Sequence, residues 1–143
     1  MLKTTPTFIL IAEDDIDDQE MIHEMIIMID PECKLEFISK GGKVMSYLES
    51  LQDGDLPNLI LLDFNLPEFT GIQLLQQMGE IKRYESIPKI LWSTSKYSVL
   101  RNECLQFGAD DFLVKPSSLQ ELENLMSYVL SLAKNDQYPV DKM

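Results

Sequence analysis

The sequence predicts an α/β protein in which helices cover both faces of a doubly wound parallel sheet. Short, β-rich apolar runs alternate along the chain with longer segments whose apolar residues recur at helical spacing, and this alternation is typical of such a sheet. Two of the runs, residues 8–11 and 59–62, contain no polar residue. Strands of that kind lie at the centre of parallel sheets, where both faces are buried. We therefore expect these two strands to be neighbours.

Five strands and five helices follow from these patterns. The predicted strands are Thr7–Ala12, Leu35–Ile38, Leu59–Asp63, Lys89–Ser93 and Asp111–Val114. Apolar stripes at i, i+3, i+4 and i+7 indicate the first and last helices, at Ile22, Met25, Ile26 and Ile29 and at Leu122, Leu125, Met126 and Val129. Three more helices are predicted at Val44–Leu51, Ile72–Ile81 and Val99–Phe107. Glycine and proline residues separate the elements, as expected of turns.

The length and charge of the chain limit what it can be. Its 143 residues fit one domain, since domains typically hold about 100–200 residues. We expect this domain to span residues 7–134 and residues 135–143 to form a tail too short for another domain. With 12 basic and 24 acidic residues, the net charge is −12. Such a charge repels nucleic acids and anionic membranes, so neither is an expected partner.

Apolar runs and cysteines indicate the cellular compartment. The longest apolar runs are far shorter than the roughly 20 residues that span a bilayer, and no signal peptide is visible. Cys33 and Cys104 belong to no metal-binding or redox motif. This usage favours two reduced thiols in a cytoplasmic protein.

Polar residues follow the carboxyl ends of four predicted strands. These residues are Glu13 and Asp14 after the first strand, Asp63 at the end of the third, Ser93 and Thr94 at the fourth, and Lys115 after the fifth. Ligands of doubly wound sheets bind outside this edge, where the strand order reverses. Each group also has a purely structural explanation, as a helix cap, an Asx turn or a solvated lysine. Their coincidence at one edge favours a functional site.

The three carboxylates at this edge indicate a metal site. Two close carboxylates repel each other by about 4 kcal/mol at an effective dielectric constant of 20, and a divalent cation relieves that repulsion. Oxygen ligands suit Mg²⁺, with Mn²⁺ as the alternative, and the absence of clustered His or Cys argues against zinc or iron. Beside such a metal, Asp63 can attack a phosphoryl group while Lys115 neutralises its oxygens. A hydrogen bond from Ser93 to the product would pull its loop toward Asp63, which makes a switch.

The motifs at these positions resemble the receiver domain of two-component response regulators. The resemblance runs from about Phe8 to Ala133 and rests on ILIAEDD at 9–15, LILLDFNLP at 59–67, Gly71, Pro88 with Ser93, GAD at 108–110 and VKP at 114–116. It implies the CheY-like, flavodoxin-like fold, with five parallel strands in the order 2-1-3-4-5. It also implies a stand-alone, single-domain response regulator without an output domain.

The resemblance implies a role for each site residue. Asp63 would be the phosphoacceptor, and Mg²⁺ would be held by Glu13, Asp14, Asp63 and the backbone carbonyl of Asn65. Lys115 would bind the phosphate, and the bond that joins it to Pro116 is usually cis in this family. Ser93 would be the switch hydroxyl and Phe112 the aromatic residue that changes rotamer with it.

Three positions depart from the common family pattern. Thr94 is larger than the Ala or Gly often found after the switch hydroxyl. We hypothesise that Thr94, together with Asn65, tunes hydrolysis and that its bulk prolongs the phosphorylated state. Glu13 replaces the commoner Asp, and its longer side chain is expected to reach the metal through water. Thr70 stands before Gly71 where Asp is common.

The resemblance further implies a partner on each side of the reaction. A histidine kinase or phosphotransfer protein would supply the phosphoryl group, and the fourth helix, fifth strand and fifth helix would present an altered surface to a downstream target. A homodimer is compatible with this function, and turnover of an external metabolite is not expected. One alternative is a receiver-like interaction module that works without phosphorylation. A second is a phosphatase with Asp63 as nucleophile, although Asn65 stands where haloacid-dehalogenase-like enzymes carry their second Asp.

Overall fold

Five parallel strands form the sheet, in the order β2-β1-β3-β4-β5. This computed structural model describes residues 5–94 and 98–135. The strands are β1 (Phe8–Ala12), β2 (Lys34–Ile38), β3 (Leu59–Asp63), β4 (Lys89–Ser93) and β5 (Asp111–Val114). The helices are α1 (Ile16–Ile29), α2 (Val44–Ser50), α3 (Gly71–Gly79), α4 (Ser98–Gln106) and α5 (Leu119–Ala133), with short 3₁₀ turns η1 (Gly41–Lys43), η2 (Asp53–Asp55) and η3 (Lys82–Tyr84). The predicted fold class and strand order are confirmed.

The two strands without polar residues lie side by side at the centre of the sheet. β1 and β3 are in parallel register from Ile9 opposite Leu59 to Ala12 opposite Leu62, and all residues of both strands are buried. Their complete burial explains why the sequence shows no polar alternation there.

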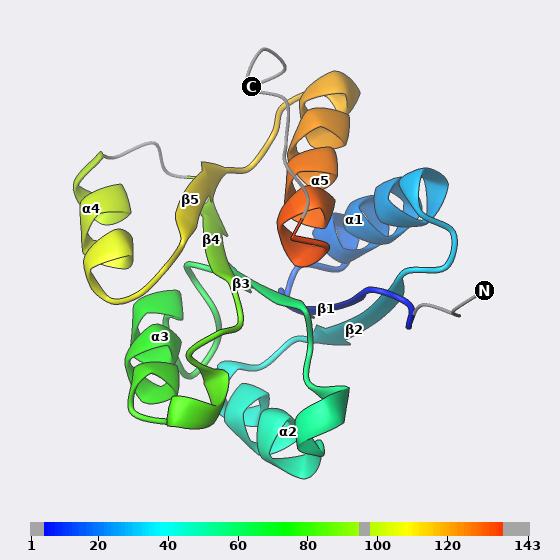
Figure 1. Cartoon of the computed structure of the whole chain (residues 1–143). Coiled ribbons are helices and arrows are strands. Elements are labelled where there is room, and N and C mark those ends of the chain that lie inside the picture. The colour runs from blue at the N-terminus through cyan, green and yellow to red at the C-terminus, as the bar shows by residue number, and fades with distance from the viewer. Residues whose placement is uncertain (1–4, 95–97, 136–143) are drawn as a thin grey trace.

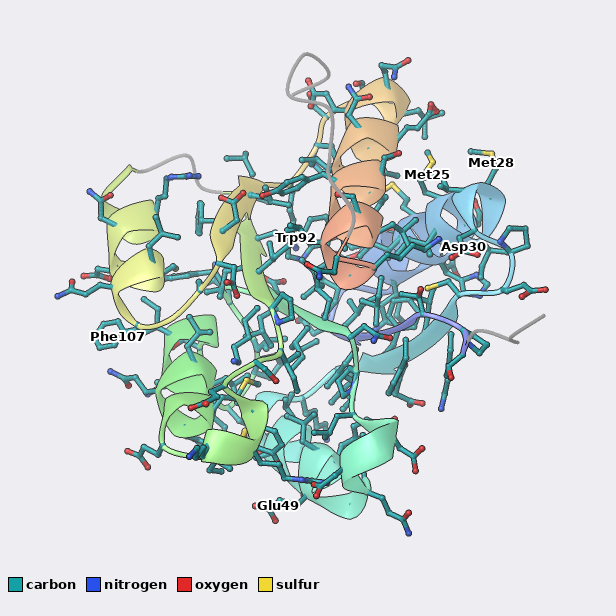
Figure 2. The ribbon with its side chains drawn as sticks, viewed as in Figure 1. Met25, Met28, Asp30, Glu49, Trp92 and Phe107 are labelled. Atoms are coloured by element: carbon teal, nitrogen blue, oxygen red, sulfur yellow. The ribbon has the colours of Figure 1, made fainter. Side chains whose placement is uncertain are left out.

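Helices cover the sheet in two layers (Figure 1). One apolar cluster joins α1 and α5 to the sheet residues Ile11, Leu61 and Trp92. The other joins α2, α3 and α4 to the opposite face. Figure 2 labels Trp92 on the side of the sheet that α5 covers. The central strands β1, β3 and β4 are therefore buried on both faces, and polar side chains converge at the ends of the strands.

The third, fourth and fifth strands have their predicted bounds, while several other boundaries shift by one or two residues for local reasons. β1 begins at Phe8 rather than Thr7, since the Phe8 amide bonds to the side chain of Asn58 at 2.7 Å, outside the strand ladder. α3 begins at Gly71 because Thr70 caps it: the Thr70 hydroxyl accepts from the amide of Gln73, whose side chain accepts from the Thr70 amide. This capping box explains structurally why Thr70 can stand where the family commonly has Asp.

Close packing positions the loop between β3 and α3. The Gly41 amide bonds to the Pro67 carbonyl at 3.1 Å, and a Cβ at Gly41 would lie 3.0 Å from that of Phe69. Glu68 has a φ of 76°, in the left-handed region that non-glycine residues seldom occupy. The loop that follows Asp63 is thus held tightly against the loop after β2.

One expectation, the cis bond before Pro116, is wrong, and another, the C-terminal tail, falls mostly outside the described residues. The bond before Pro116 is trans, as are the other peptide bonds of the described segments, so the cis bond implied by the resemblance is wrong here. Trans is the form that X–Pro bonds favour by about 0.5–1 kcal/mol. Nearly all of the expected tail, residues 136–143, lies outside the described residues. Within the described segments, the helices are too short or too polar to cross a membrane.

Candidate phosphoacceptor and metal site

Glu13 lies directly after β1 and is completely buried. Its amide continues the strand pairing by donating to the Ile38 carbonyl at 3.0 Å, and its carboxylate accepts from the Asp15 amide at 3.0 Å. Burial raises the pKa of Glu13 to about 7, with a further contribution from the carboxylate of Asp63. A buried acid beside another acid therefore requires a cation to stay ionised.

Asp63 ends β3 and is buried, with both carboxylate oxygens occupied. One oxygen accepts from the Asn65 amide at 3.0 Å, which is the Asx turn considered from the sequence. The other lies 3.0 Å from the Lys115 Nζ. At Gly71, an added Cβ would lie 3.0 Å from the Asp63 carbonyl. The side chain of Asp63 is therefore fixed in direction by its own loop and by one lysine.

Lys115 follows β5 and holds three carboxylates together. Its backbone amide donates to the Ser93 carbonyl at 2.8 Å. Its Nζ lies 2.9 Å from Asp18 and 3.0 Å from both Glu13 and Asp63. Burial alone would lower the pKa of Lys115, but these three carboxylates raise it above its ordinary value. The ammonium therefore stays charged and offsets part of the acidic charge.

Asp18 is a site residue that the sequence analysis missed. It lies in the first turn of α1, and its amide bonds to the capping side chain of Asp15 at 3.0 Å. The sequence shows it only as one of several acids after Asp14, a pattern explained by the helix dipole. Its position in the first turn of a helix that starts at the site was a signal, but Asp17 shares that position.

The other predicted residues lie on neighbouring strand ends. Ser93 is buried and ends β4, one position beyond Trp92, which pairs with Asp63. Thr94 follows it and is exposed. Phe112 is buried on β5, opposite Leu91 in the register. The structure thus brings Ser93 to the same sheet edge as Asp63 and places Phe112 inside the core beside α4.

Three carboxylates can face a common cation. Glu13, Asp14 and Asp63 each offer an oxygen, and these oxygens lie within 4.8 Å of one another. Glu13 and Asp63 are buried, while Asp14 is exposed. An all-carboxylate donor set fits a hard divalent cation such as Mg²⁺ or Mn²⁺. A cation with one exposed ligand would keep several waters, as Mg²⁺ prefers.

The geometry agrees with comparisons to known proteins. The family model of the response regulator receiver domain matches residues 9–127. The chain belongs to this family. Response regulators are signalling proteins that receive phosphoryl groups from histidine kinases or phosphotransfer proteins, and their receiver domains bind Mg²⁺ at an acidic pocket. The resemblance inferred from the motifs is therefore confirmed.

Curated plant proteins are among the relatives of this receiver. Two-component response regulator ARR8 of Arabidopsis thaliana is 27% identical over an alignment of 158 residues, gaps included, that covers 98% of this chain and 69% of the relative. Two-component response regulator ORR5 of Oryza sativa subsp. japonica is 31% identical over 119 residues, covering 80% and 85%.

Solved structures share the fold of this receiver. The phosphorylated cyanobacterial phytochrome response regulator RcpA superposes with a TM-score of 0.82 at 22% identity, covering 91% of this chain and 95% of that chain. The Mn²⁺-bound form of response regulator Rcp1 gives 0.79 at 24% identity, covering 94% and 100%. Chemotaxis response regulator CheY4 of Vibrio cholerae gives 0.73 at 21% identity, covering 87% and 99%.

Proposed function

We propose that this receiver accepts a phosphoryl group on Asp63 from a histidine kinase or phosphotransfer protein, and that the functional unit spans residues 7–134. The observation that carries the proposal is the position of the Asp63 carboxylate. It lies 3.0 Å from the Lys115 ammonium and shares a possible cation site with Glu13 and Asp14. The arrangement offers a nucleophile and the positive charge that phosphoryl transfer requires.

In the transfer step, an Asp63 oxygen attacks the phosphorus of a phosphohistidine. The new P–O bond forms as the P–N bond breaks, and the imidazole nitrogen leaves with its electron pair and takes up a proton. Lys115 neutralises charge on the transferred oxygens. A cation held by Glu13, Asp14, Asp63 and the Asn65 carbonyl would add further neutralisation of that charge.

Residues at the same edge of the sheet would transmit phosphorylation of Asp63 to the surface formed by α4, β5 and α5. Ser93 would donate a hydrogen bond to the phosphoryl oxygens, and Phe112 would adjust its position in the core as the loop moves. α4 and α5 flank β5 (Figure 1), so a movement of this loop would alter the surface that these three elements form. We propose that a downstream protein binds there.

Two residues are proposed to tune the lifetime of the phosphate. Thr94 is exposed and directly follows Ser93, so its side chain would lie near the path of an attacking water. Asn65 is two positions from the phosphoacceptor and is bonded to it through its amide. Replacing Thr94 with Ala is expected to shorten the half-life of the phosphoprotein, and an unchanged half-life would contradict this role.

Incubation with acetyl phosphate and Mg²⁺, followed by intact mass measurement, tests the function. The expected result is a gain of one phosphoryl group, which Asp63→Asn and chelation of the metal both prevent. No gain would favour a module that works without phosphorylation. Steady release of product from p-nitrophenyl phosphate would instead favour the phosphatase. Asp53→Asn is the matched control, since Asp53 is an exposed acid that pairs with Arg83 and does not belong to the carboxylate cluster of Glu13, Asp14 and Asp63.

A further inference from the structure

Asp18 contacts the Lys115 ammonium, and the proposed transfer step gives it no role. Its Oδ2 lies 2.9 Å from the Lys115 Nζ. The same Nζ lies 3.0 Å from one oxygen of Glu13 and one oxygen of Asp63. Its contacts with Asp18 and Asp63 are hydrogen bonds, whereas the Glu13 Oε1 accepts no hydrogen bond. Asp18 and Asp63 therefore use two of the three N–H donors of the ammonium in the unphosphorylated protein.

Phosphorylation changes the number of acceptors around Lys115. A phosphoryl group on Asp63 adds oxygens with about −1.5 to −2 units of charge, by analogy with other phosphorylated side chains. These oxygens compete with the three carboxylates for a single ammonium, which has only three N–H donors. When Lys115 turns toward the phosphoryl group, we expect its bond to one of the other carboxylates to be lost.

Burial decides which carboxylate leaves. The side chain of Glu13 has no exposed surface, while that of Asp18 is 21% exposed. A buried carboxylate without its partner pays a large desolvation cost, whereas a side chain in the first turn of a helix can rotate into water. Asp63 cannot leave because it carries the phosphoryl group.

We propose that Asp18 holds Lys115 in the unphosphorylated protein and is displaced from it by the phosphoryl group on Asp63. This inference rests on the proposed function and adds a positioning residue to it. Asp18 then competes with the phosphoryl group for Lys115 and weakens its binding. Its release also changes the charge displayed by the first turn of α1, so the state of Asp63 reaches a surface outside α4, β5 and α5.

Binding of BeF₃⁻, an anion that mimics a phosphoryl group on aspartate, tests the inference. The wild type, Asp18→Asn and Asp17→Asn are titrated with BeF₃⁻ at saturating Mg²⁺ and followed by ¹⁹F NMR. Asp17→Asn is the matched control, because it removes the same charge from the same turn at an exposed residue. We expect Asp18→Asn to bind BeF₃⁻ at least about threefold more tightly than Asp17→Asn, as loss of a competing ion pair predicts. Equal or weaker binding by Asp18→Asn would overturn the inference.

Two further measurements separate the possible failures. If the wild type does not bind BeF₃⁻, or if Asp63→Asn binds it equally well, the proposed function is wrong. The inference about Asp18, which rests on that function, is then wrong too. A structure of the wild type with Mg²⁺ and BeF₃⁻ shows the displacement directly. The distance from Asp18 Oδ2 to Lys115 Nζ is expected to exceed about 4 Å, the limit for an ion pair. A retained ion pair would show that Asp18 has only a structural role.

Discussion

The hydroxyl of Tyr128 on α5 donates a 2.6 Å hydrogen bond to the carboxylate of Asp111 on β5. The other oxygen of Asp111 lies 3.1 Å from Arg101 on α4, and Arg101 also donates to the Phe112 carbonyl at 3.1 Å. One carboxylate thus ties α4, β5 and α5 together. These elements form the proposed output surface, so their relative positions depend on a small polar network.

Replacing Tyr128 with Phe is expected to destabilise the protein by about 1–2 kcal/mol, because a hydrogen bond to a charged acceptor is lost while the ring is kept. Urea denaturation followed by circular dichroism measures the change. The control is Tyr47→Phe on α2, where no hydrogen bond joins the hydroxyl to another described residue. Equal free energies of unfolding for Tyr128→Phe and the wild type would contradict the prediction.

The same hydrogen bond gives the stability a pH dependence. Burial, together with the bond to Asp111, raises the pKa of Tyr128. An unfolded tyrosine loses its proton near pH 10, so above that pH the unfolded state binds fewer protons than the folded state and stability falls. The stability advantage of the wild type over Tyr128→Phe is therefore expected to be constant up to about pH 9 and to shrink above about pH 10. A difference that stays constant through this range would count against the bond.

Gly71 is expected to tolerate a side chain poorly, since the start of α3 approaches the end of β3, which carries Asp63, closely. A Cβ there would lie 2.8 Å from Leu91 and 3.0 Å from the Asp63 carbonyl. We expect Gly71→Ala to lower the free energy of unfolding by about 1–3 kcal/mol, as overpacking does. Gly79, at the other end of α3, has nothing within 4 Å of such a Cβ. Gly79→Ala should therefore be neutral or stabilising by up to about 1 kcal/mol, and thermal denaturation of both variants compares them.

The strand-end cluster could be predicted from the sequence because topology alone creates it. Once β1, β3 and β5 are parallel, residues such as Glu13, Asp63 and Lys115 must meet at one edge. The sequence could not identify Asp18 among its acidic neighbours as the residue that contacts Lys115. The orientation of its side chain depends on where α1 begins and on how that helix packs against the sheet. Likewise, the Tyr128–Asp111 bond depends on how α5 packs, which the apolar stripe of that helix leaves open.

Lys115 is expected to stabilise the fold as well as the phosphoryl group. Lys115→Met would leave the buried Glu13 and Asp63 without their cation, and breaking a buried ion pair in this way costs about 3–5 kcal/mol. Mg²⁺ should recover part of this loss, because it binds the carboxylates that the ammonium has released. A ligand that binds only the folded state stabilises that state, so Mg²⁺ should shift the urea midpoint of Lys115→Met more than that of the wild type.

Lys134→Met serves as the control. The Lys134 side chain is 39% exposed and pairs with Asp30, so this ion pair should contribute at most about 1 kcal/mol, independent of Mg²⁺. Equal Mg²⁺ shifts in all three proteins would mean that Lys115 and the cation do not share the same carboxylates.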